Sequence, residues 1–238
     1  MLYIAHRGAP LLRTENTLPS FKLAAEAGLD WYELDVHLTK DGHLLVHHDY
    51  DFTRSAGIDR EISELTLPEI RSLAIRRVSA EETEPCRAPT LNEVFEIIPE
   101  TANVNIEIKN DAGRYPGIER AVADFAARNG HGRIVVSNFN YSSLRIIRSL
   151  DPALRLGVLI KTEPFDRALQ TALELNAESI NISIRFISRE RAEQAHAAGL
   201  KILVWSISDR PQLEFAAQCG ADGVFINDPR LKLPALQR

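Results

Sequence analysis

"SINISIRFISRERAEQAHAAGLKILVWSI" (residues 179–207) contains the pattern that decides the fold. Its two ends, 179–182 and 201–207, are short runs rich in β-branched residues, which are typical of strands. Between them, residues 188–199 have apolar side chains at helical spacing and end in glycine, as many helices do. The segment therefore predicts a strand, a helix and a second, parallel strand.

The same alternation extends over the whole chain. Further β-rich runs predict strands at 2–5, 31–36, 104–109, 133–137, 154–160 and 223–226. Amphipathic stretches predict helices at 18–28, 88–99, 116–130, 141–150, 165–177 and 210–220. About eight strands alternating with helices in 238 residues predict a closed (β/α)₈ TIM barrel. The alternative is an open doubly wound sheet, but its glycine-rich first turn is not matched by "HRGAPLLRTENT" (6–17), which has one glycine.

Residues 51–87 interrupt the alternation, because they carry many charges and show little periodicity beyond "LTLPEIRSL" (65–73). We expect an insertion in the second βα connection, packed over one end of the barrel. The next helix is expected to begin with a capping box formed by Thr90 and Glu93. No linker composition divides the chain, so we expect residues 1–238 to form a single barrel domain that contains the insertion.

Composition and charge limit the classes of protein. With 45% hydrophobic and 26% charged residues, the chain suits a globular protein with a sizeable core. A net charge of -5 gives no overall basic field for nucleic acid or anionic lipid. Cys86 and Cys219 have no metal-like spacing and fit reduced thiols. No signal-like segment or apolar run long enough to span a membrane is present, so we expect a cytoplasmic protein.

Charged triplets stand at the ends of three predicted strands. In a TIM barrel, functional groups gather where the strands end. The triplets are "HRG" (6–8), "ELD" (33–35) and "EIK" (107–109), which we expect to close the first, second and third strands. Residues two apart on a strand face the same side. Glu33 and Asp35, and likewise Glu107 and Lys109, are therefore expected to point into one mouth.

Three carboxylates in one mouth predict a cation site. Glu33, Asp35 and Glu107 would repel one another unless a cation lay between them. A ligand set made only of oxygen suits Ca²⁺ or Mg²⁺. The alternative is a network of ion pairs in which Arg7 and Lys109 neutralise the carboxylates, and the spacing leaves both open.

Histidines near the acidic residues indicate proton transfer. "LLVHHDY" (44–50) places two histidines shortly after the second predicted strand, and His6 ends the first. A histidine pair can supply a base and an acid near neutral pH. Arg7 and Lys109 supply the positive charge that a phosphate requires. Together these groups indicate cleavage of a phosphodiester.

The series of motifs resembles the glycerophosphodiester phosphodiesterase family, of the bacterial cytosolic type, over essentially the whole chain. The motifs are "HRGAP" (6–10), "ENTLPSF" (15–21), "ELDV" (33–36), "VHHDY" (46–50), "PTLNEVF" (89–95), "NIEIK" (105–109), "VSNFN" (136–140), "VWSISD" (204–209) and "ADGVFINDP" (221–229). The resemblance implies a TIM barrel with a small insertion. It also implies hydrolysis of glycerophosphodiesters, such as glycerophosphocholine or glycerophosphoethanolamine, to sn-glycerol 3-phosphate and an alcohol with Ca²⁺ or Mg²⁺.

The resemblance also implies a role for each residue that matches a family motif. It makes His6 and His48 the catalytic histidines and gives His47 a packing or solvated role. The remaining assignments are Glu33, Asp35 and Glu107 as metal ligands, Arg7 and Lys109 as phosphate contacts, Glu15 as the residue that orients Arg7 or His6, and Trp205 as a wall of the glycerol pocket.

The chain departs from the family pattern at two places. Ser206 and Ser208 replace a threonine and an asparagine, and because both are small and polar we expect activity to be retained. A proline directly follows Asp228 and shortens the turn, which leaves the role of Asp228 open. Lys161 is expected either to reach a phosphate or to be solvated.

Two other functions stay under consideration. A lysophospholipase D or related phosphodiesterase would share the barrel and the carboxylates, although the charged stretch 51–87 does not indicate a lipid substrate. A non-catalytic binding barrel would have no need of both histidines and all three carboxylates. The expected partner is a small-molecule glycerophosphodiester, with no nucleic acid and no membrane span. The preferred alcohol, the acid and base assignments and the oligomeric state are not given by the sequence.

Overall fold

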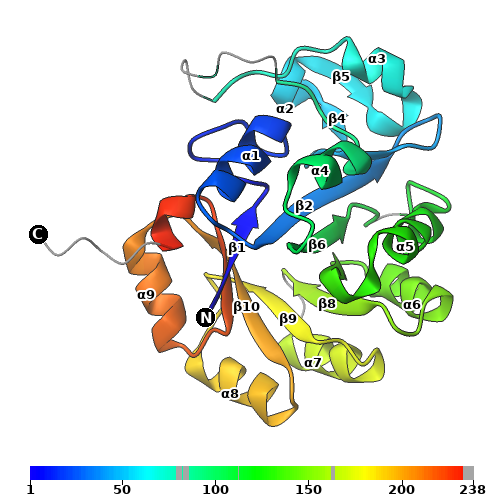
Figure 1. Cartoon of the computed structure of the whole chain (residues 1–238). Coiled ribbons are helices and arrows are strands. Elements are labelled where there is room, and N and C mark those ends of the chain that lie inside the picture. The colour runs from blue at the N-terminus through cyan, green and yellow to red at the C-terminus, as the bar shows by residue number, and fades with distance from the viewer. Residues whose placement is uncertain (79–81, 83–85, 112, 162–163, 233–238) are drawn as a thin grey trace, which may run out of the picture.

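The structure, a computed structural model, describes residues 1–78, 82, 86–111, 113–161 and 164–232. In these residues, eight parallel strands form a barrel that the pairing of β1 with β2 closes (Figure 1). The strands are β1 (Leu2–His6), β2 (Trp31–Leu38), β6 (Asn103–Ile108), β7 (Ile134–Asn138), β8 (Arg155–Ile160), β9 (Ser179–Ser183), β10 (Lys201–Ile207) and β11 (Gly223–Ile226). The prediction of a TIM barrel with these eight strands is confirmed.

Helices surround the barrel and connect successive strands (Figure 1). They are α1 (Leu18–Glu26), α4 (Leu91–Ile97), α5 (Ile118–Asn129), α6 (Tyr141–Leu150), α7 (Phe165–Glu174), α8 (Arg189–Ala197) and α9 (Arg210–Gln218). The predicted capping box of α4 is confirmed, since the Glu93 carboxylate accepts from the Thr90 backbone N–H at 2.7 Å and Thr90 Oγ1 accepts from Glu93 N–H at 3.3 Å. This cap fixes where the chain re-enters the helical ring after the insertion.

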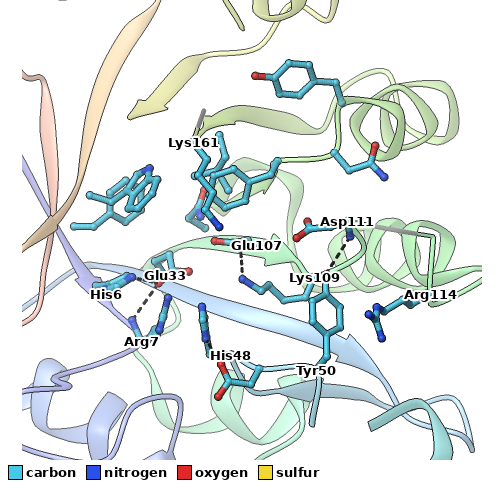
Figure 2. A pocket seen from close by; sticks show the side chains of 18 of the residues that line it. His6, Arg7, Glu33, His48, Tyr50, Glu107, Lys109, Asp111, Arg114 and Lys161 are labelled. Carbon is cyan, nitrogen blue, oxygen red and sulfur yellow. Dashed lines mark hydrogen bonds and ion pairs between the residues drawn. The ribbon is translucent and has the colours of Figure 1, made fainter. Parts of the chain in front are cut away.

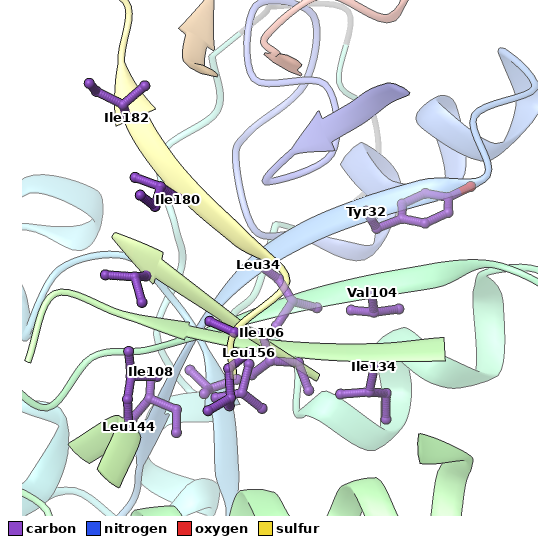
Figure 3. Packing of buried hydrophobic residues seen from close by; sticks show 14 of the residues in the cluster. Tyr32, Leu34, Val104, Ile106, Ile108, Ile134, Leu144, Leu156, Ile180 and Ile182 are labelled. Atoms are coloured by element: carbon purple, nitrogen blue, oxygen red, sulfur yellow. The ribbon is translucent and has the colours of Figure 1, made fainter. Parts of the chain in front are cut away.

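Alternate residues of each strand face the helices or the barrel interior. Ile106, Leu156 and Ile180 belong to the large apolar cluster between strands and helices (Figure 3). A separate apolar cluster forms the floor of the barrel interior and consists of Ile4, Trp31, Val135, Leu203 and Phe225. Two positions after each of these five residues, the chain again points into the barrel interior, closer to the strand ends. Several of the residues at these positions are polar, His6, Glu33 and Asn227 among them. The barrel interior therefore presents polar groups at the end where the strands finish.

The connection between β2 and α4 holds the insertion. It contains β3 (Leu44–Val46), β4 (Asp51–Phe52), α2 (Thr53–Ala56), β5 (Ile58–Glu61), η1 (Ile62–Glu64) and α3 (Leu67–Arg71). Its buried apolar residues, among them Phe52, Ile62 and Ile70, form a cluster of their own. In Figure 1 these elements lie beyond the end of β2, next to α1.

Two strand ends differ from the sequence prediction. Strand β2 does not close at Asp35 but continues to Leu38, because β3 pairs antiparallel with its last residues and supplies the hydrogen bonds that the barrel does not. Strand β6 ends at Ile108, and Lys109 follows it with its backbone N–H donating to the carbonyl of Val36 at 3.0 Å. Within the described residues, no helix is long and apolar enough to cross a membrane.

Candidate active site

A cavity of about 1070 Å³ opens at the mouth of the barrel where the strands end (Figure 2). It brings together most of the residues singled out in the sequence: His6, Arg7, Glu33, His48, Glu107, Lys109, Lys161 and Trp205. Asp35 is fully buried beneath its floor, and Glu15 lines a second, smaller cavity next to it. Residues that are distant in the sequence therefore share one concave site.

The three carboxylates predicted to bind a metal lie together. One ligand oxygen from each of Glu33, Asp35 and Glu107 lies within 4.8 Å of the others, because Asp35 is in register with Glu107 on the neighbouring strand. All three side chains are buried. Burial, and then repulsion from Asp35, raises the pKa of Glu33 well above its usual range. An assembly of buried carboxylates under such repulsion is suited to a hard cation.

Two positively charged side chains contact this group of three carboxylates. Arg7 Nε lies 3.0 Å from Asp35 Oδ2, and Lys109 Nζ lies 2.7 Å from Glu107 Oε1 and 3.4 Å from Asp35 Oδ1. Burial opposes ionisation of Asp35, but Arg7 and Lys109 together hold its pKa well below its usual range. The ion-pair alternative is thus realised at Asp35. Asp35 Oδ1 nevertheless accepts no hydrogen bond from any described residue, which leaves an oxygen suited to a metal ligand.

The turn after β1 has a strained backbone that aims Arg7 at the acidic group. Arg7 has a φ of 54°, and its backbone N–H donates to Glu33 Oε2 at 3.1 Å. Gly8 follows with a φ of 90°, and a Cβ there would lie 2.4 Å from Ser20 Oγ. Only glycine fits this position, so the "HRG" triplet has a structural reason for each of its members.

His6 is held by the barrel. Its Nδ1 lies 2.6 Å from Asn227 Oδ1, and Asn227 Nδ2 donates to Ser208 Oγ at 2.7 Å. Because the amide nitrogen is engaged by Ser208, the amide oxygen accepts from Nδ1–H of His6, and the Nε2 lone pair faces the acidic group, 3.9 Å from Glu33 Oε2. Burial, and then the charge of Arg7, lowers the pKa of His6 to about 3. His6 is therefore a neutral imidazole at neutral pH.

His48 is held by its neighbour in the chain. Its Nδ1 lies 2.7 Å from Asp49 Oδ1, and a carboxylate acceptor at this nitrogen leaves Nε2 free for chemistry. The side chain is 31% exposed, against 14% for His6. Burial lowers the pKa of His48, while the charge of Asp35 and the hydrogen bond to Asp49 oppose that shift. Figure 2 shows both histidines beside the acidic residues.

The other predicted residues have clear positions. Glu15 Oε2 lies 3.1 Å from Arg7 Nη1, so it contacts Arg7 rather than His6. His47 is buried, its Nε2 is 3.0 Å from Ser55 Oγ, and it lies outside the cavity at the mouth, in line with a packing role. Asp228 forms an ion pair with Arg230 at 2.6 Å.

Trp205 and Lys161 line the cavity on the side opposite the insertion. Trp205 donates from Nε1 to the carbonyl of Asn181 at 3.1 Å, and its ring lies against Phe139 with a centroid separation of 5.8 Å. This contact holds the indole edge-on to a second aromatic residue of the cavity wall. Lys161 follows the last residues of β8 and extends into the same cavity (Figure 2).

Comparison with known proteins agrees with this geometry. The family model described as "Glycerophosphoryl diester phosphodiesterase family" matches residues 6–231. The chain belongs to this family. A glycerophosphodiester phosphodiesterase of Caldanaerobacter subterraneus subsp. tengcongensis is 37% identical over 233 residues, which cover 96% of this chain and 94% of that protein. One of Bacillus altitudinis is 32% identical over 231 residues, 94% of each chain.

A solved structure shows the same fold. The phosphodiesterase of Oleispira antarctica, in complex with the product sn-glycerol-3-phosphate, is 27% identical with a TM-score of 0.84 and covers 97% of this chain and 94% of that one. The resemblance drawn from the motifs is confirmed, and the chain is a phosphoric diester hydrolase. These comparisons favour an enzyme over the alternative of a non-catalytic binding barrel.

Three residues of this phosphodiesterase site were not assigned a role from the sequence. Asn227 and Asp49 hold the two histidines, and Arg54 lies 2.5 Å from Asp49 Oδ2. Asp49 directly follows His48, and this adjacency was the one signal for it. Asn227 could be found only by knowing that the last strand lies beside the first.

The outer part of the cavity carries both signs of charge. On the insertion side, Arg114 lies over the Tyr50 ring at 4.6 Å and pairs with Glu61 at 2.5 Å. On the side of α6 and α7, Arg145 and Arg167 line the wall. The outer wall therefore differs from the cluster of Glu33, Asp35 and Glu107, because it carries charges of both signs.

Proposed function

We propose that this phosphodiesterase hydrolyses glycerophosphodiesters to sn-glycerol 3-phosphate and an alcohol, using His6 and His48 and a divalent cation, Ca²⁺ or Mg²⁺. The observation that carries the proposal is the meeting of two histidines, each anchored at Nδ1, with three buried carboxylates in one cavity. The named activities of the relatives and the product bound in the Oleispira antarctica structure support the substrate class.

Glu33, Asp35 and Glu107 would hold the cation, which fits their oxygen-only donor set and the unsatisfied Oδ1 of Asp35. When bound, a divalent cation supplies Lewis-acid stabilisation of charge on phosphate oxygens. The chain's own cations have a complementary part. Arg7 and Lys109 would bind the phosphate through charge-assisted hydrogen bonds and hold it against the two histidines.

The two histidines divide the proton transfers. Each has its Nδ1 occupied and its Nε2 available. The histidine that is a neutral imidazole can accept a proton from the attacking hydroxyl at Nε2, and the other, as the imidazolium, can donate its Nε2 proton to the leaving alcohol oxygen. Trp205 presents an aromatic wall for the carbon chain of the glycerol. The alcohol leaving group would then occupy the outer cavity, toward Tyr50 and Arg114.

The test is release of sn-glycerol 3-phosphate from glycerophosphocholine by the purified protein. We expect release that EDTA abolishes, that Ca²⁺ or Mg²⁺ restores and that His6→Ala removes. If a folded, metal-supplied protein releases nothing from any glycerophosphodiester, the proposal is wrong. Choline release from a lysophospholipid in the same sample would then identify a lysophospholipase D.

A further inference from the structure

Arg54 joins two loops that flank the proposed active site. It lies in α2 of the insertion, and its guanidinium reaches two carboxylates on separate segments. Nε lies 2.5 Å from Asp49 Oδ2, in the connection between β3 and β4, and Nη2 lies 2.5 Å from Glu15 Oε1, in the connection between β1 and α1. One planar side chain thus holds both segments in a fixed relation.

Each of these carboxylates uses its other oxygen on a residue of the proposed site. Asp49 Oδ1 lies 2.7 Å from Nδ1 of His48, and Glu15 Oε2 lies 3.1 Å from Nη1 of Arg7. The contacts therefore form a continuous chain from His48 through Asp49, Arg54 and Glu15 to Arg7. Both oxygens of Asp49 and both oxygens of Glu15 are thus engaged by residues of this series of contacts.

We propose that Arg54 is a positioning residue that orients His48 through Asp49 and Arg7 through Glu15 at the same time. The inference rests on the proposed function, since it assigns Arg54 a part in that reaction. Arg54 also lines the cavity at the mouth, but the ion pairs of its guanidinium are with these two carboxylates, and the proposed effect on the reaction runs through them.

The geometry explains why an arginine is suited to this place. The guanidinium is a rigid plane whose Nε and Nη2 donate in fixed directions, so two carboxylates can be held at a set angle. A lysine has one ammonium at the end of a flexible chain and fixes no such angle. Because the Arg54 side chain is 59% exposed, its ion pairs contribute little to overall stability. Its effect is therefore expected on orientation rather than on folding.

A second cavity borders Arg54 and has two further arginines, Arg76 and Arg77, in its wall. It has a volume of about 340 Å³ and is lined by Glu15, His48, Arg54 and Ser55 among others. Glu15 already lines this cavity, and removal of the guanidinium would extend it toward Asp49. Asp49 and Glu15, about one quarter exposed, would then be free to rotate toward water.

The first test compares Arg54→Ala, Arg54→Lys and the control Arg60→Ala in steady-state kinetics on glycerophosphocholine. Arg60 lies in the same insertion, forms an exposed pair with Glu69 at 3.7 Å, and does not itself line the cavity. We expect Arg54→Ala to lower kcat about 10- to 100-fold, since small misplacements of catalytic groups cost up to about 10²-fold. Arg54→Lys should recover part of this loss, and Arg60→Ala should match the wild type.

A comparison of combined variants tests the route of the effect. If Arg54 acts only through Asp49 and Glu15, adding Arg54→Ala to the double variant Asp49→Ala/Glu15→Ala causes no further loss of kcat, because the two carboxylates that it orients are already gone. If Arg54→Ala costs as much in that background as in the wild type, or if Arg54→Ala equals Arg60→Ala, the proposal is wrong. Arg54→Lys, which keeps the charge and the stem, provides the same comparison should Arg54→Ala fail to fold.

A readout without substrate separates this proposal from the proposed function. In ¹⁵N-labelled protein, the imidazole of His48 should show the tautomer with hydrogen on Nδ1 in the wild type and in Arg60→Ala, and a mixture of tautomers in Arg54→Ala. An unchanged His48 signal in Arg54→Ala contradicts the proposal whether or not the wild type turns over glycerophosphocholine. Absence of turnover with the expected signals contradicts only the proposed function.

Discussion

The two histidines of this site are held by different parts of the molecule. His6 is anchored by Asn227 and Ser208, which follow β11 and β10, so its support is the barrel itself. His48 is anchored by Asp49, which contacts Arg54 in the insertion. The same requirement, an occupied Nδ1 and a free Nε2, is met by a neutral amide in one case and by a charged, partly exposed pair in the other.

The difference follows from what each support is built on. Strands β1, β10 and β11 are neighbours in a hydrogen-bonded parallel sheet, and each contributes residues to the large barrel core, among them Ala5, Val204 and Val224. The insertion has a two-stranded sheet, β4 with β5, and a small cluster of its own. Small units with few buried contacts open at lower free energy than a large core. The His48 side is therefore expected to be the more adaptable half of the site.

The largest expected effect is removal of either imidazole. His6→Ala and His48→Ala should each lower kcat by about 10²- to 10⁴-fold, the range for loss of a general acid or base. Added imidazole should restore more activity to His48→Ala, because the vacated place is more open on that side. Turnover with and without imidazole measures this. Equal rescue of the two variants would contradict the proposed asymmetry.

Substitution of each histidine's anchor by the side chain type of the other anchor has a smaller expected effect on kcat. It also shifts the pKa of each histidine in a defined direction. Asn227→Asp places a carboxylate on Nδ1 of His6, which favours the imidazolium and raises its pKa from about 3. Asp49→Asn removes a carboxylate from His48 and lowers the pKa of that imidazole further. Each change should lower kcat about 10- to 100-fold, as is typical for hydrogen-bond partners of histidines at functional sites.

The pH dependence of kcat/KM distinguishes the two anchor variants, because it reports ionisations of the free enzyme. The ionisation of His6 should move to higher pH in Asn227→Asp, and that of His48 to lower pH in Asp49→Asn. A shift of both variants in the same direction would show that the anchors do not set the two imidazoles separately. Both substitutions keep the shape of the side chain, so both variants are expected to fold. A thermal unfolding measurement on each variant provides the common control.

The barrel could be predicted from the sequence because its eight strands and surrounding helices repeat one pattern. Each strand is long enough for its apolar run to be distinct, and the helices end in residues such as Gly199 with positive φ. Strands β3, β4 and β5 were not predicted, since they have 2–4 residues and show no alternation. The pairing of β3 depends on where the chain folds back on β2, and β4 and β5 pair only with each other.

The candidate site was predictable to the extent that it lies on strand ends. Parallel strands of a barrel finish at one rim, so His6, Glu33, Asp35 and Glu107 could be placed together without knowing any contact. The anchors could not be placed in this way. His6 and Asn227 are 221 positions apart, and their contact depends on closure of the barrel. Arg54 depends on the path of the insertion, for which the sequence gives no period.

The smallest expected effect tests whether the insertion and the barrel unfold separately. Thr90 caps α4 in the barrel ring, and Thr90→Ala should lower the free energy of unfolding by about 1 kcal/mol through loss of its capping hydrogen bond. Thr66 occupies the matching place at α3 of the insertion, where its side-chain Oγ1 donates to Glu69 Oε2 at 2.8 Å. Neither residue lines the cavity at the mouth, so kcat should stay unchanged well below the unfolding temperature.

Hydrogen exchange and thermal unfolding of these two capping variants decide the point. Thr66→Ala should speed exchange in α3 and in β4 and β5 and leave the barrel transition in place, whereas Thr90→Ala should lower the barrel transition itself. If both variants lower a single transition, the insertion and the barrel form one cooperative unit. His48 would then be held as firmly as His6, and the contrast between their anchors would be one of charge alone.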